Sequence, residues 1–188
     1  MDAITALTQR VSAPKLIEPA PSADQLDSIR RAALRAADHG NLRPWRFLEV
    51  AGPGLEALGA LYLDAGLLVN PDLNDAQQLR LRSLPLRAPM IVVAIAKTQA
   101  HPKVPREEQL LSAACAVQNM LNAAFAMELG AFWRTGEMAL DRQVATGLGL
   151  NAGEEIVGFL YLGHVDGPIK QAPELNPTDF FEVWPKPI

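Results

Sequence analysis

The chain has 188 residues but only one cysteine, Cys115, so it cannot form an internal disulfide framework or a zinc cluster built from cysteines. It also lacks an uninterrupted, charge-free apolar run long enough to cross a bilayer. The first ten residues, MDAITALTQR, show neither the basic region nor the apolar region of a signal peptide. We therefore expect a cytoplasmic protein that has no membrane partner.

The chain has fewer basic residues than acidic ones, 17 compared with 21, so its formal net charge is −4. An acidic chain has no overall electrostatic attraction for nucleic acid, so we expect no nucleic-acid partner. The charge is uneven, because residues 76–106 contain six basic side chains and no acidic one. Such a segment can attract an anionic small molecule. A solvated helix face that pairs with acidic neighbours is the more common explanation.

Several catalytic motifs are absent. The three histidines, His39, His101 and His164, have no metal-ligand spacing, so we expect no metal site. The chain contains no Gly-x-Ser-x-Gly elbow, no P-loop and no Gly-x-Gly-x-x-Gly fingerprint. Nucleophilic hydrolysis, phosphoryl transfer and a Rossmann dehydrogenase therefore lose their usual sequence support.

What is present is an ordinary globular composition, with 49 % hydrophobic and 20 % charged residues. The length suits one domain over residues 1–188. Periodicity and capping signals predict helices near 3–10, 22–37, 55–67, 106–129 and after Asp141, and a further Arg-rich helix ending near Ser83. They predict strands near 45–50, 89–96, 131–134 and 156–162. The fold class is therefore α+β, with roughly four strands and five or six helices.

Three of these elements carry specific expectations. Ser22 and Gln25 form a capping box at the start of the second helix. The run 89–96 is apolar throughout, which is typical of a strand buried on both faces. The helix 106–129 is apolar almost all round, so it should lie centrally or at a large interface, with Gly130 as its C′ residue. The proline-rich tail from Asp166 should wrap over a neighbour.

Polar side chains at the ends of these elements are candidate ligand contacts. Arg10 and Ser12 can hold a phosphate or the polar edge of a ring, although a helix cap and a turn hydroxyl are the more common explanation when the pair is taken alone. Arg35 and His39 are four residues apart, so at the end of a helix they would share one face and suit an anion. Taken alone, the pair is more commonly explained by stabilisation of the helix end. Trp133–Gly136 ends a strand, where backbone amides can approach a ligand or merely form a tight turn.

Read in order, these segments resemble the FMN-dependent nitroreductases. The resemblance rests on Arg10-x-Ser12, on the stretch from His39 to Phe47 with its Pro-Trp-x-Phe pattern, on the helix that follows Val104, on Leu129–Gly136, and on Ile156–Gly163. It covers about residues 2–163, and it is nearest to the short bacterial NAD(P)H nitroreductases. No single motif is highly specific, but their order and spacing are.

The resemblance implies an α+β sandwich with a central, mostly antiparallel sheet flanked by helices, in an intertwined homodimer with FMN at the interface. It implies that Arg10 and Ser12 hold the FMN phosphate and ring edge, and that Arg35 and His39 reach FMN across the dimer. Trp133, Arg134 and Thr135 would line the flavin from the strand end. Lys170 stands where longer members have a basic pair.

The resemblance also implies an activity. NADH or NADPH would reduce the flavin and leave before a nitroaromatic, a quinone or a related small aromatic acceptor is reduced, in a ping-pong cycle. A flavin carries its own redox chemistry, so no catalytic side chain is expected. Two alternatives stay open: a flavin reductase or dehydrogenase with another acceptor, and a flavin-binding protein without turnover.

Overall fold

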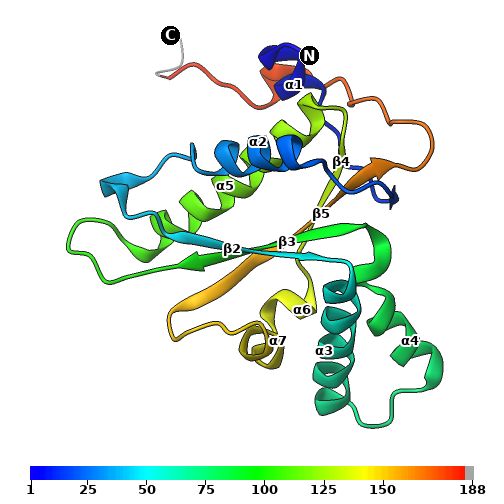
Figure 1. Cartoon of the computed structure of the whole chain (residues 1–188). Helices are drawn as coiled ribbons and strands as arrows, with labels where there is room; N and C mark the ends of the chain where they lie inside the picture. Colours follow the sequence, from blue (N-terminus) through cyan, green and yellow to red (C-terminus); the bar gives the residue numbers. More distant parts are fainter. Residues whose placement is uncertain (185–188) are drawn as a thin grey trace.

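The computed structural model describes residues 1–184, in which a five-stranded sheet lies between two layers of helices (Figure 1). The strands are β1 (Leu16–Ile17), β2 (Trp45–Ala51), β3 (Met90–Lys97), β4 (Gly130–Arg134) and β5 (Glu154–Val165). The order is β1-β5-β3-β2, and β4 also pairs with β5. Every strand pairing within residues 1–184 is antiparallel. The expected α+β architecture is confirmed, with one strand more than the sequence indicated.

Helices cover both faces of the sheet (Figure 1). One face is covered by α2 (Ala23–Ala33) and α5 (Arg106–Ala126). On the other side lie α3 (Pro53–Val69), α4 (Asp75–Ser83), α6 (Glu137–Leu140) and α7 (Arg142–Gly147), while α1 (Ala3–Gln9) contacts α5. No helix among residues 1–184 is long and apolar enough to cross a membrane.

Strand β3 is apolar over nearly all of its length because both of its faces are covered by a hydrophobic core. Ile91, Val93 and Ile95 belong to the core on the α3 side, whereas Met90, Val92 and Ala94 belong to the core on the α5 side. Successive side chains of a strand point to opposite faces, so a strand covered on both faces has no polar alternation. The prediction of a strand buried on both faces is confirmed.

The start of α2 is as predicted, but its end is not. The Ser22 hydroxyl accepts a hydrogen bond from the Gln25 amide at 3.3 Å, and the Gln25 side chain accepts one from the Ser22 amide at 2.9 Å. The helix then ends at Ala33 rather than near Ala37. The amides of Arg35 and Ala36 bond to carbonyls only three residues back, at 3.1 and 3.2 Å. These tighter bonds close the last turn and release the chain.

The prediction that Gly130 ends the long helix is also wrong. Helix α5 stops at Ala126, and Glu128 adopts the left-handed conformation, with φ of 61°. Gly130 instead begins β4, where a Cβ atom would overlap the side chains of Leu16 and Val165. The glycine allows β1 and β5 to approach β4 closely, which is a tertiary requirement rather than a helix signal.

Candidate functional site

The segment from Arg10 to Lys15 connects α1 to β1 and is held against the sheet by its backbone. The Ala13 amide donates to the Ala131 carbonyl of β4 at 3.0 Å, and the Asp166 amide donates to the Lys15 carbonyl at 3.2 Å. Arg10 follows the last helical residue of α1, and its guanidinium donates to the Ser12 hydroxyl at 3.3 Å. The sheet thereby fixes the position of two predicted ligand contacts.

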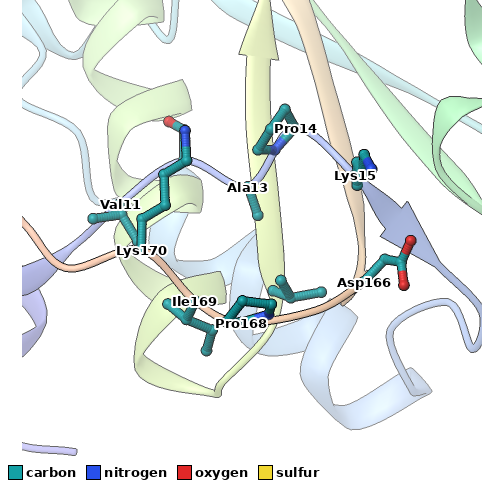
Figure 2. Close-up of a pocket in the computed structure, with 10 residues that line it drawn as sticks. Val11, Ala13, Pro14, Lys15, Asp166, Pro168, Ile169 and Lys170 are labelled. Atoms are coloured by element: carbon teal, nitrogen blue, oxygen red, sulfur yellow. The ribbon is translucent and has the colours of Figure 1, made fainter.

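A cavity of about 200 Å³ separates this segment from the beginning of the C-terminal tail. Ser12 and Lys170 both line it, so the structure brings the Arg10–Ser12 pair close to a second cation. Figure 2 shows the Lys170 side chain extending from the tail towards the segment that contains Val11 and Ala13. Asp166 lies at the other end of this cavity. The end near Ser12 is therefore the one suited to an anion.

A second cavity, of about 360 Å³, shares Pro14 and Lys15 with the first and is also lined by Arg87 and Arg134. Arg134, the last residue of β4, donates from its guanidinium to the Pro14 carbonyl at 3.4 Å. This contact joins the end of β4 to the segment after α1. The first two cavities and the end of β4 are therefore neighbours in space.

Arg134 lies over two aromatic rings and lacks an acidic partner within residues 1–184. Its guanidinium carbon lies 4.1 Å from the ring centroid of Phe132 and 5.3 Å from that of Tyr161. Burial, followed by repulsion from Arg87, lowers the pKa of Arg134. Its Nε is buried and has no hydrogen-bond partner in the described chain. A ligand with a carbonyl or an anionic edge would satisfy that donor.

A third cavity, of about 550 Å³, shares Arg87 and Arg134 with the second and extends towards α3 and α4. Thr135 also lines this cavity, at the exposed end of β4. Trp133 borders it too, but its indole packs with the core under α2 and α5 and donates to the Val157 carbonyl at 3.3 Å. Because successive side chains of a strand point to opposite faces of the sheet, the Trp133 ring lies on the face opposite the Arg134 guanidinium.

Arg35 and His39 do not share a helix face, and the structure corrects that expectation. Because α2 ends at Ala33, Arg35 lies in the following turn and His39 in a short 3₁₀ helix (His39–Asn41). The exposed His39 Nδ1 lies 2.6 Å from a carboxylate oxygen of Glu108 on α5. Neither residue lines the three cavities described above. Within one subunit, they are separate from Arg10, Ser12 and Lys170.

Two basic residues of the second cavity, Lys15 and Arg87, were not among the sequence candidates. Lys15 lines the first two cavities, and Arg87 lines the second and third. Arg87 belongs to the basic segment 76–106, so the charge count did contain a signal. No signal in the sequence pointed to Lys15, because its position depends on the pairing of β1 with the distant strand β5.

Comparison with known proteins agrees with this architecture. The family model described as the nitroreductase family matches residues 7–164, and the chain belongs to that family. A relative in Escherichia coli K12, named "Putative NAD(P)H nitroreductase YdjA", is 41 % identical over 163 residues, covering 87 % of this chain and 88 % of that protein.

Two solved structures are similar in fold. A nitroreductase-like family protein from Bacillus cereus has a TM-score of 0.82 and 20 % identity, with 98 % of this chain and 97 % of that one covered. A nitroreductase from Bacteroides fragilis, solved with bound FMN, has a TM-score of 0.72 and 20 % identity, with 97 % and 99 % covered.

Proposed function

We propose that this protein is an FMN-dependent oxidoreductase that takes hydride from NADH or NADPH and reduces a nitroaromatic, a quinone or a related electrophile. The observation that carries the proposal is the row of three cavities, which runs from Ser12 and Lys170 to Arg134 and Thr135. The name of the relative YdjA and the FMN bound to the Bacteroides fragilis protein support it.

The residues along these cavities suit FMN. A phosphate needs cations and hydroxyl donors, and the end of the first cavity near Ser12 combines that hydroxyl with Lys170 and with the guanidinium of Arg10. A flavin ring presents carbonyl and nitrogen acceptors along one edge, and Arg134 has a buried donor without a partner in the described chain. Arg10, Ser12 and Lys170 would therefore bind the phosphate, and Arg134 and Thr135 the ring.

When bound, FMN supplies the hydride and electron chemistry, so the protein needs no acidic, basic or nucleophilic side chain for it. The side chains of this chain bind and orient the cofactor. Arg134 is fixed by its stacking on Phe132 and Tyr161, so it can present its donors without reorganisation.

A homodimer is part of the proposal. Large apolar side chains are exposed on α1 and in the tail, including Ile4 at 68 %, Phe181 at 79 % and Trp184 at 90 % exposure. On α5, Leu111 is 64 % exposed. Exposed apolar surface of this kind is typical of subunit interfaces. A partner subunit would cover it and would bring its own Arg35 and His39 towards the FMN site.

The deciding experiment is an absorbance spectrum of the purified protein before and after anaerobic addition of NADH or NADPH. The proposal predicts a flavin spectrum that loses its visible absorbance when the nicotinamide is added. A colourless protein that also fails to bind added FMN would contradict the proposal. A coloured protein that neither nicotinamide reduces would instead be a flavin-binding protein without this activity.

A further inference from the structure

We propose that the end of the third cavity near α4 binds the negative charge of the acceptor, and that the acceptor is an aromatic carboxylate. This inference rests on the proposed function, because it names the class of molecule that the reduced cofactor would serve. The cavity also includes Arg134 and Thr135, which are assigned to the flavin ring; the acceptor site is the α3 and α4 end of the same cavity, with Arg80 and Tyr62.

The cavity combines an aromatic lining with basic residues. Tyr62, Phe132 and Tyr161 supply flat apolar surfaces, while Arg80, Arg87 and Arg134 supply positive charge. Its volume of about 550 Å³ is within the range of pockets that hold small organic ligands. A planar ring fits the aromatic surfaces, and an anionic substituent fits the guanidinium groups.

These arginines are not neutralised by the protein. Within residues 1–184, none of the three takes part in a salt bridge, and Glu137 is the one acidic residue of the cavity lining. By contrast, Arg106, which belongs to the same basic segment, is paired with Glu155 at 2.6 Å. Arg106 therefore pairs with an acidic neighbour, whereas Arg80 and Arg87 have no acidic partner within residues 1–184.

A buried hydroxyl gives a second, independent indication of a ligand. Tyr62 is 1 % exposed and lines the cavity, yet its hydroxyl has no hydrogen-bond partner in the described chain. Leaving a buried donor unpaired is unfavourable, and a carboxylate can accept from the Tyr62 hydroxyl. Burial lowers the pKa of Arg134 and repulsion from Arg87 lowers it further; the negative charge of a carboxylate would offset that repulsion.

The test uses two probes with the same ring, 4-nitrobenzoate and its uncharged amide, 4-nitrobenzamide. Binding to the purified protein is measured by calorimetry without nicotinamide, so turnover does not enter. The wild type should bind the carboxylate more tightly than the amide. Arg80→Gln should weaken carboxylate binding about tenfold, the size expected for one charge-assisted contact, and leave amide binding unchanged. Added salt should reduce the preference, because Arg80 is exposed.

Arg82→Gln is the matched control, because Arg82 lies on the same helix but does not line this cavity. It should leave both affinities unchanged. Equal binding of the two probes by the wild type, or equal weakening of both by Arg80→Gln, would overturn the inference.

A third probe, adenosine 2′-phosphate, tests whether the anion that binds near Arg80 is the phosphate of the hydride donor NADPH rather than the acceptor's carboxylate. If Arg80→Gln weakens this probe and not 4-nitrobenzoate, the site belongs to NADPH and the inference is wrong. The absorbance experiment decides the proposed function separately.

Discussion

Arg10 illustrates how one residue supports two explanations until its contacts are known. At the end of a helix, an arginine can cap the last carbonyls or reach forward to a ligand. Here Arg10 leaves the helical conformation, with φ of −58° and ψ of 129°, and its guanidinium bonds to Ser12 two residues later. Since Ser12 lines the first cavity, the guanidinium is held beside that cavity rather than over the end of α1.

Replacing Arg10 should therefore weaken FMN binding. One charge-assisted contact to a phosphate contributes about 1.5–3 kcal/mol, so Arg10→Ala should raise the FMN dissociation constant roughly 10- to 100-fold. Ser12→Ala removes a neutral hydrogen bond and should cost about 1 kcal/mol. Fluorescence titration of the apoprotein with FMN measures both effects. Arg142→Ala, on the exposed surface of α7, is the control. Equal affinity in the wild type and the Arg10 variant would remove Arg10 from the site.

At the scale of elements, the site depends on how closely β4 approaches β5. Gly158 of β5 lies at an irregularity in the pairing with β3 and has φ of 154°. A Cβ atom at this position would overlap the indole of Trp133 and would lie 2.9 Å from the Arg134 carbonyl. The glycine therefore lets the end of β4 pack on β5 with Trp133 directed to one face and Arg134 to the other.

Gly158→Ala should displace Trp133 and the end of β4. We expect a loss of about 1–3 kcal/mol in the free energy of unfolding, as for an overpacked core, together with a red-shifted tryptophan emission and weaker FMN binding. Urea denaturation and fluorescence measure these changes. Gly149→Ala is the control for backbone strain alone, because Gly149 has φ of 69° but open space where the Cβ would be. If both variants leave the emission and FMN binding unaffected, close packing at Gly158 does not position the site.

At the scale of the whole molecule, the candidate residues form two groups. Arg10, Ser12, Lys170, Arg134 and Thr135 lie along connected cavities, whereas Arg35 and His39 lie beyond α2 and line none of them. His39 already has a partner, Glu108, within its own subunit. A role for Arg35 and His39 in binding FMN therefore requires a second subunit.

Mixed dimers test this arrangement directly. One subunit carries Arg10→Ala and the other carries Arg35→Ala with His39→Ala. If the contacts come from opposite subunits, both lesions fall on one site, and the other site retains full affinity for one FMN per dimer. Equilibrium titration of the purified mixed dimer measures this stoichiometry, and each parental homodimer should bind FMN weakly at both sites. Two equally weakened sites would show that all three residues act within one subunit, and a stable monomer with full FMN binding would exclude the dimer altogether.

Local sequence determined much of the secondary structure. The capping box at Ser22, the apolar strand β3 and the helix that begins at Arg106 follow from hydrogen bonds and periodicities within a few residues of each other. The order of the motifs also indicated the family, and residues 7–164 match its model. Local signals failed where a distant contact decided the outcome. Gly130 resembles a helix stop in the sequence, but it is required by the side chains of Leu16 and Val165.

The site itself was decided by tertiary structure. Arg134 meets the Pro14 carbonyl across 120 residues of chain, and Lys170 of the tail meets the cavity beside Ser12. Arg80 and Arg87 look like ordinary surface charge in the sequence, and only the packing of α4 and the turn after it on α3 brings them to the same cavity as Arg134. Residue identity fixes which groups can bind an anion. Which of them remain unpaired, and face one another across a cavity, depends on contacts between segments that no local pattern encodes.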